Sequence, residues 1–123
     1  MILLIEDDVV SQHIITALLN RLRFPYRVAR DAAGAAAALA LGPVDLVLVD
    51  LAVPDAEGVA LLASLRAHPA LHDVPALFCT AFTDAATIER ALASGAVELV
   101  RKPIDVDLLA RAVDRALRYA PVR

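Results

Sequence analysis

The sequence predicts an α/β domain in which a doubly wound parallel sheet of five strands is covered by five helices on its two faces. Two observations predict it. Short apolar runs alternate along the chain with longer segments whose apolar residues recur at helical spacing. The run Leu46–Val49 is apolar without interruption, as expected for a parallel strand that is buried on both faces. Right-handed crossovers between such strands leave few possible topologies.

The predicted strands are too short to be helices, and most are bounded by charged residues, Pro or Gly. They are Ile2–Ile5, Arg27–Ala29, Leu46–Val49, Ala76–Cys79 and Leu99–Arg101. The predicted helices lie between and after them, and each has an apolar stripe or a recognisable end. Their markers are Ile14, Leu18 and Leu22; the alanine-rich segment Ala33–Leu41, closed by Gly42 and Pro43; Leu61, Leu62 and Leu65 after Gly58; Ile88 and Leu92 before Gly95; and Leu109, Val113 and Leu117 after Asp105 as the expected N-cap.

Length and composition set bounds on the class of protein. With 123 residues and a mass of 13.1 kDa, the chain has the size of one domain. Its formal net charge of -3 argues against DNA binding, because contacts to phosphates require clustered Lys and Arg. The apolar stretches are interrupted before they could span a bilayer, and no secretory signal is visible. The single cysteine, Cys79, reads as a small core residue and fits a reducing compartment. We therefore expect a cytoplasmic protein that binds neither DNA nor membrane.

Residues able to carry chemistry stand at the ends of four predicted strands. These are Glu6, Asp7 and Asp8 after the first strand, Asp50 before a Pro- and Gly-containing loop, Thr80 after the fourth strand, and Lys102 after the fifth. In a parallel sheet these ends meet at one edge, which is where ligands bind in open α/β folds. Crowded carboxylates repel one another unless a cation lies among them, and Mg²⁺ prefers such oxygen ligands.

A lysine and a hydroxyl beside these carboxylates would complete a site for a phosphoryl group, with Asp50 as the nucleophile. Each residue alone also has a simpler interpretation. The acidic cluster suits a solvated loop or a helix cap, Thr80 an ordinary strand end, and Lys102 a surface lysine. Asp8 is expected to support the metal ligands or to lie in the loop, and not to be a ligand itself.

Four segments, in this order, point to a known family: LLIEDD, LVLVDLAVPDAEG, LFCTA and LVRKP. In order and spacing they resemble the receiver domain of two-component response regulators, the CheY-like superfamily. The resemblance covers residues 1–123 and implies one phosphoacceptor domain with the flavodoxin-like strand order 2-1-3-4-5. The segment EDDVVSQ, residues 6–12, is also similar to receivers fused to hybrid histidine kinases.

The resemblance implies a set of metal ligands and an acceptor. Glu6 and Asp7 match the acidic pair that holds Mg²⁺. Asp50 matches the phosphoacceptor, which also ligates the metal, and the main-chain carbonyl of Ala52 matches a further ligand.

The resemblance also implies the remaining site residues and the partners. Thr80 matches the hydroxyl that closes on the phosphoryl group, and Lys102 matches the lysine that pairs with it. The bond between Lys102 and Pro103 is cis in this family. The phosphoryl donor would be a histidine kinase or a histidine phosphotransfer protein, and the output would be a protein bound by the fourth helix, fifth strand and fifth helix. The domain would be no enzyme but a stoichiometric Mg²⁺-dependent phosphoacceptor with, at most, slow self-dephosphorylation.

Three positions depart from the family pattern. Leu99 stands where the family often has Tyr or Phe, an aromatic residue that changes rotamer during switching. Ala52 and Phe82 occupy positions that commonly tune hydrolysis of the phosphoaspartate, and neither side chain can orient an attacking water. The sequence therefore predicts a comparatively long-lived phosphorylated form.

Two alternatives remain open at this stage. A pseudo-receiver would keep the fold and act as a binding module without phosphorylation, and Leu99 favours this reading. A hydrolase of the haloacid-dehalogenase type also uses a strand-end Asp and Mg²⁺. Those enzymes carry a second Asp two residues after the nucleophile, and Ala52 occupies that position here.

Overall fold

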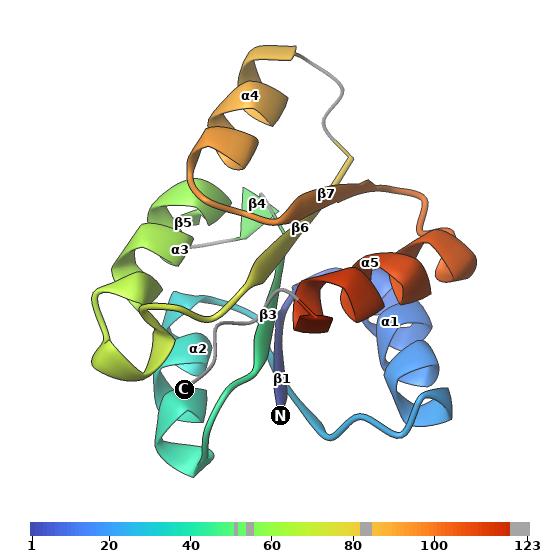
Figure 1. The fold of residues 1–123 in the computed structure, drawn as a ribbon, viewed down its shortest axis with the longest axis horizontal. Helices are drawn as coiled ribbons and strands as arrows, with labels where there is room; N and C mark the ends of the chain where they lie inside the picture. The colour runs from blue at the N-terminus through green and yellow to red at the C-terminus, as the bar shows by residue number, and fades with distance from the viewer. Residues whose placement is uncertain (51, 54–55, 82–84, 119–123) are drawn as a thin grey trace.

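Five parallel strands in the order β2-β1-β3-β6-β7 form the main sheet of the computed structural model, which describes residues 1–50, 52–53, 56–81 and 85–118 (Figure 1). In chain order they are β1 (Ile2–Ile5), β2 (Tyr26–Ala29), β3 (Leu46–Asp50), β6 (Ala76–Thr80) and β7 (Glu98–Arg101). Because β6 and β7 are the fourth and fifth strands of this sheet, the expected order 2-1-3-4-5 is confirmed. The ends of each strand lie within about one residue of the predicted bounds.

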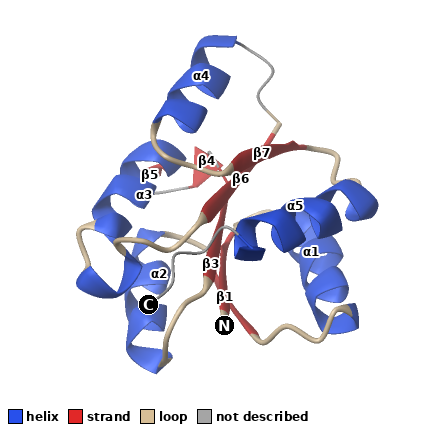
Figure 2. Ribbon diagram, viewed as in Figure 1, coloured by secondary structure: helices blue, strands red, loops and turns tan. Residues whose placement is uncertain are grey.

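The helices lie on both faces of the sheet, as predicted (Figure 2). Helices α1 (Val9–Arg21) and α5 (Val106–Arg118) cover one face, and α2 (Ala32–Ala38), α3 (Gly58–Arg66) and α4 (Ala85–Ala93) cover the other. The expected helix Ala33–Leu41 is α2 followed by the 3₁₀ helix η1 (Leu39–Leu41). A second 3₁₀ helix, η2 (Pro69–Leu71), precedes β6. Among the described residues, no helix has the length and apolar character needed to cross a membrane.

Strand β3 shows why the sheet carries apolar residues on both faces. Leu46 and Leu48 pack in the cluster under α1 and α5, whereas Val47 and Val49 pack in the cluster under α2, α3 and α4. Successive side chains of a strand point to opposite faces, so a strand covered on both sides needs an uninterrupted apolar run. All five residues of β3 are buried, including its last residue, Asp50.

Two helix ends follow the sequence signals. The side chain of Asp105 accepts hydrogen bonds from the main-chain N–H groups of Asp107 and Leu108, at 2.9 and 3.2 Å, and so caps α5 as expected. Gly95, just after α4, has φ +97°, the left-handed conformation that glycine adopts without penalty.

The segment after β3 differs from the predicted loop. Ala52–Val53 (β4) pairs antiparallel with Ala56–Glu57 (β5), and α3 begins directly afterwards at Gly58. Strands of two residues are too short to show a hydrophobic period, so the sequence gives no sign of this pair.

The C-terminus of α1 contains a strained residue. Arg23 has φ +62°, while its N–H donates to the Asn20 carbonyl at 3.0 Å and the N–H of Phe24 donates to the Leu19 carbonyl at 3.0 Å. These two bonds form a Schellman motif, in which the left-handed position is usually glycine.

Replacing Arg23 with glycine is therefore expected to stabilise the protein by about 1 kcal/mol, because a side chain in the left-handed region is penalised more than glycine loses in chain entropy. Urea unfolding measures it as a higher midpoint at an unchanged m-value. The matched change Arg21→Gly, inside the last turn of α1, is expected to lower the midpoint. A lower midpoint for Arg23→Gly would contradict this account.

Candidate functional site

The site lies at the carboxyl ends of β1, β3, β6 and β7. Strand register brings these ends level: Ile5 pairs with Val49, Asp50 with Cys79, and Thr80 with Arg101. Residues that are far apart in the sequence therefore meet at one edge of the sheet, as expected from parallel strands.

Cys79 is buried here among apolar residues, and this burial raises the pKa of its thiol to about 12, so the thiol is inert at neutral pH.

Lys102 bridges two carboxylates from different strands. Its Nζ donates to Oε1 of Glu6 at 3.0 Å and to Oδ2 of Asp50 at 3.3 Å. Glu6 is completely buried, and Asp50 is 7% exposed. Removing one partner from an ion pair this far from solvent costs more free energy than removing one from an exposed pair, because the remaining charge is left buried and unpaired. The structure thus brings together three of the residues that the sequence singled out.

Asp7 joins these two carboxylates. Glu6, Asp7 and Asp50 can each offer one oxygen so that the three atoms lie within 4.8 Å of one another. Within the described part of the chain, Oε2 of Glu6 is a buried side-chain atom without a hydrogen-bond partner. A buried oxygen of this kind needs a partner, and a divalent cation held by three carboxylates would supply it. The donor set therefore fits Mg²⁺.

The protonation of Glu6 depends on its burial and on the charged groups beside it. Burial, together with the adjacent Asp50 carboxylate, raises the pKa of Glu6 to about 7, although Lys102 acts in the opposite direction. Burial lowers the pKa of Lys102, but its hydrogen bond to Glu6 and the charges of Asp50 and Glu6 outweigh this, so the pKa of Lys102 is raised overall. Without a metal, the site holds more negative charge than one lysine neutralises.

The stability of the metal-free protein is expected to fall as pH rises from about 4.5 to about 7. Folded Glu6 keeps a proton that the unfolded chain releases in this range, so its contribution is complete below the unfolded pKa and is lost through the folded pKa. Mg²⁺ binds the ionised form, so the stabilisation by Mg²⁺ should grow over the same range. Thermal unfolding at several pH values, in EDTA and in Mg²⁺, measures both trends. In EDTA, Glu6→Gln should flatten the slope, and an unchanged slope would exclude Glu6 as its source.

Asp8 has a structural role that the sequence analysis offered only for the acidic cluster as a whole. It is the N-cap of α1, and its Oδ2 accepts hydrogen bonds from the N–H of Ser11 at 3.0 Å and from the Ser11 hydroxyl at 2.6 Å. These bonds, the hydroxyl one first, lower the pKa of Asp8. Its own N–H donates to Oε1 of Glu6 at 3.2 Å. An Asp directly before a helical pattern is a capping signal and could have revealed this role.

Gln12 is a further residue at the site that sequence reasoning missed. Its side-chain Nε2 donates to the main-chain carbonyl of Glu6. The contact joins α1 to the end of β1, and no sequence signal specifies it.

The remaining predicted site features are Thr80, Ala52, Phe82 and the Lys102–Pro103 bond. Thr80 is 1% exposed and its carbonyl accepts a hydrogen bond from the N–H of Lys102 at 2.7 Å, while the role of its hydroxyl stays a prediction. The Lys102–Pro103 bond is cis, as the resemblance implied. Ala52 begins β4, and its carbonyl as a metal ligand stays a prediction. Phe82 lies outside the described residues.

Leu99 lies on β7, three residues before Lys102. It is half-buried and packs against the apolar cluster under α2, α3 and α4. A leucine here fills part of this cluster, but it has neither the ring nor the hydroxyl of the aromatic residue that the family often carries at this position.

The doubly wound α/β fold thus brings three carboxylates and a lysine together at the carboxyl ends of its strands. The model of the response regulator receiver domain family matches residues 2–114, and the chain belongs to this family. The transcriptional regulatory protein ZraR of Salmonella typhimurium is 34% identical over 119 residues, which are 96% of this chain and 26% of the relative. KdpE of Staphylococcus aureus, also a transcriptional regulatory protein, is 32% identical over 108 residues, 88% of this chain and 46% of the relative. The chain thus spans a quarter to a half of the length of these relatives.

Solved structures agree with this assignment. The signal receiver domain of an HD domain-containing protein from Pseudomonas fluorescens Pf-5 has a TM-score of 0.88 at 29% identity, covering 97% of this chain and 94% of that one. The signal receiver domain of a signal transduction histidine kinase from Syntrophus aciditrophicus has a TM-score of 0.83 at 28% identity, covering 95% of this chain and 89% of that one.

Proposed function

We propose that residues 1–123 form a single receiver domain that accepts a phosphoryl group on Asp50 from the phosphohistidine of a histidine kinase or a histidine phosphotransfer protein. Mg²⁺ would be held by Glu6, Asp7, Asp50 and the carbonyl of Ala52. One observation carries the proposal: Lys102 contacts both Glu6 and Asp50, and the Asp7 carboxylate lies close enough for all three to share one cation. The setting of such a relay would be the cytoplasm.

The chemical step is a transfer between two nucleophiles. A carboxylate oxygen of Asp50 forms the new bond to phosphorus as the bond from phosphorus to the donor's imidazole nitrogen breaks, and that nitrogen keeps the electron pair. When bound, Mg²⁺ would neutralise the charge on the phosphoryl oxygens. Lys102 would pair with one of these oxygens, and the hydroxyl of Thr80 would donate to another. Each protein molecule accepts one phosphoryl group and keeps it, so the protein would act as a switch rather than as an enzyme that turns over.

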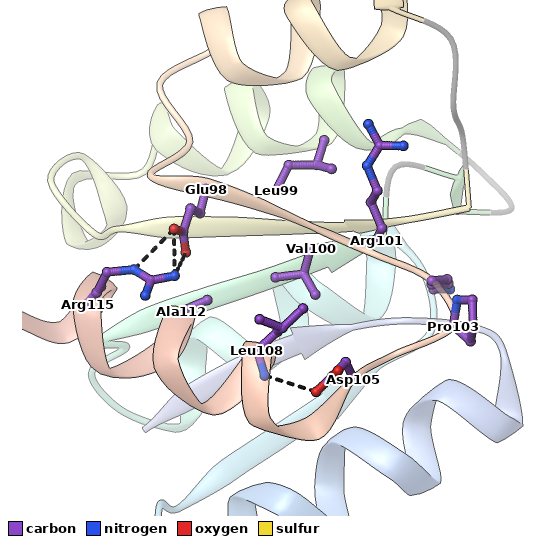
Figure 3. Close-up of a pocket in the computed structure, with 10 residues that line it drawn as sticks. Glu98, Leu99, Val100, Arg101, Pro103, Asp105, Leu108, Ala112 and Arg115 are labelled. Carbon is purple, nitrogen blue, oxygen red and sulfur yellow. Dashed lines mark hydrogen bonds and ion pairs between the residues drawn. The ribbon is translucent and has the colours of Figure 1, made fainter.

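Phosphorylation of Asp50 would change the protein surface through Lys102, which directly follows β7. Lys102 is among the residues that line a groove of about 420 Å³ along β7 and α5, and Leu108, Ala112 and Arg115 line its α5 side. Figure 3 shows Val100 pointing toward α5 and Leu99 pointing toward the α4 side of the strand. Arg115 and Glu98, which both line the groove, are joined by hydrogen bonds from Nη2 of 2.7 and 2.9 Å and from Nε of 3.1 Å. A shift of Lys102 toward a phosphoryl group would change this face, where we propose that an output protein binds.

The phosphorylated form is proposed to be long-lived. An attacking water needs a polar side chain to orient it, and the side chains at positions 52 and 82, Ala and Phe, offer none. The decay of the phosphorylated protein in Mg²⁺ measures the lifetime directly, and decay within seconds would contradict the proposal.

Beryllofluoride, which mimics a phosphoryl group on a carboxylate, tests the proposed site without a donor protein. The ¹⁹F spectrum is expected to show bound fluoride signals only when beryllium, fluoride and Mg²⁺ are all present with the wild-type protein. Samples without Mg²⁺ and samples without beryllium are the controls. Bound signals of equal intensity in EDTA would contradict a role for the metal.

A pseudo-receiver is the second candidate, and Leu99 is the observation that favours it. Such a module would bind its partner equally with and without beryllofluoride. A binding partner whose affinity does not change between the two states would support the pseudo-receiver. The hydrolase alternative has no comparable support, because Ala52 replaces the acid that it requires.

A further inference from the structure

The side chain of Gln12, on α1, donates a hydrogen bond to the main-chain carbonyl of Glu6, a proposed metal ligand. We propose that Gln12 is a positioning residue for Mg²⁺, which fixes the Glu6 peptide and thereby the spacing of the Glu6 and Asp7 carboxylates. The inference rests on the proposed function, because it takes these two carboxylates as metal ligands.

Both main-chain groups of Glu6 are held, each by a different element. Its N–H donates to the carbonyl of Ala29 at the end of β2, at 2.9 Å. Its carbonyl lies just past the end of β1 and accepts from Nε2 of Gln12. A buried carbonyl must find a donor, and here the donor is a side chain of the following helix. The Glu6 backbone is thus fixed at the point where the chain leaves the sheet.

The position of Gln12 on α1 explains its reach. The N–H of Gln12 donates to the carbonyl of Asp8 at 2.9 Å, so it lies one turn into the helix that Asp8 caps. Long helical side chains point back toward the helix N-terminus, which directs the Gln12 amide over the first turn and onto the loop before it. A shorter side chain at this position would stop before the Glu6 carbonyl.

The orientation of this carbonyl sets the position of Asp7. The Glu6 carbonyl and the Asp7 N–H belong to one planar peptide group, so a rotation that releases the carbonyl also turns the Asp7 backbone. The hydrogen bond from the Asp8 N–H to Oε1 of Glu6, at 3.2 Å, would be disturbed by the same rotation. Mg²⁺ requires near-ideal octahedral geometry, so a small displacement of one carboxylate weakens its binding. Gln12 therefore acts on the metal through the backbone.

The test is Mg²⁺ binding by isothermal titration calorimetry, which suits a chain without tryptophan. Gln12→Met keeps the length of the side chain but removes the donor. Its Kd for Mg²⁺ is expected to weaken about tenfold, as for other residues that orient metal ligands. In the beryllofluoride titration, the Mg²⁺ concentration at half-saturation should rise by the same factor, while the amplitude at saturating Mg²⁺ stays that of the wild type. A role in folding alone would lower the melting temperature in EDTA without moving the Kd.

Asn20→Leu is the matched control, because it also removes an amide donor from α1. Asn20 donates to the Tyr26 hydroxyl at 3.2 Å, two turns away from the site, and its loss should leave the Kd for Mg²⁺ unchanged. If Gln12→Met does not fold, Gln12→Asn, which withdraws the amide by one methylene, is expected to show the same weakening. An unchanged Kd in the folded Gln12 variant would overturn this inference alone. A wild-type protein that binds no Mg²⁺ would overturn the proposed function as well.

Discussion

Replacing Asp50 with asparagine is expected to abolish phosphorylation while leaving the fold intact. The side-chain amide has the shape of the carboxylate but no negative oxygen that can attack phosphorus. The change also removes the negative charge beside buried Glu6, so the pKa of Glu6 should fall toward its ordinary value. The metal-free variant should therefore be at least as stable as the wild type above neutral pH.

The measurement is the intact mass after incubation with acetyl phosphate and Mg²⁺, together with urea unfolding in EDTA. Asp73→Asn is the matched control, because this exposed carboxylate lies before β6 and away from the site. It should accept one phosphoryl group like the wild type. Phosphorylation of the Asp50 variant to the wild-type level would place the acceptor elsewhere.

Replacing Lys102 with methionine is expected to have the largest effect on stability. Lys102 is the only lysine in the sequence, and it contacts both buried carboxylates. Removing one partner of a buried ion pair leaves an uncompensated charge, which costs about 3 kcal/mol at pH 8 without Mg²⁺. The loss should shrink as the pH falls below 7, because Glu6 then takes up a proton.

The same variant should bind Mg²⁺ more tightly than the wild type, because the cation that competes for the carboxylates is gone. Urea unfolding and calorimetry measure these two opposite effects. Arg101→Met is the control: it removes a neighbouring cation that is exposed on β7, and both quantities should stay close to the wild type. A Lys102 variant that is as stable as the wild type in EDTA at pH 8 would show that the contacts of Lys102 with Glu6 and Asp50 contribute nothing to the free energy of unfolding.

The sequence was sufficient to predict the main sheet because each strand is an apolar run between clear interruptions. Leu46–Val49 illustrates this: its lack of alternation predicted burial on both faces, and Leu48 and Val49 do pack in opposite clusters. The pair β4–β5 could not be predicted, since two residues carry no period. The helical spacing of Ile14 and Leu18 likewise located α1 but not its left-handed end at Arg23, because the glycine that usually marks such an end is absent from the sequence there.

The site was predictable only in part, for a similar reason. Strand ends in a parallel sheet must converge, so the meeting of Glu6, Asp50 and Lys102 follows from topology. The bond from Gln12 to the Glu6 carbonyl depends on a side-chain direction and on where α1 begins, and neither is visible in the residues alone. The cap formed by Asp8 has a local signal, an Asp directly before a helical pattern, but its place next to Glu6 and Asp7 is also typical of a metal-binding acidic cluster.

The phosphorylation of wild-type protein by acetyl phosphate, followed by intact mass with Mg²⁺ or EDTA, tests the central claim most directly. The account predicts a gain of one phosphoryl group in Mg²⁺, no gain in EDTA, and loss of the group on treatment with hydroxylamine, which cleaves acyl phosphates. Peptide mapping should then place the modification on Asp50. No gain in Mg²⁺, together with no binding of beryllofluoride, would contradict the phosphoacceptor assignment and leave the pseudo-receiver in its place.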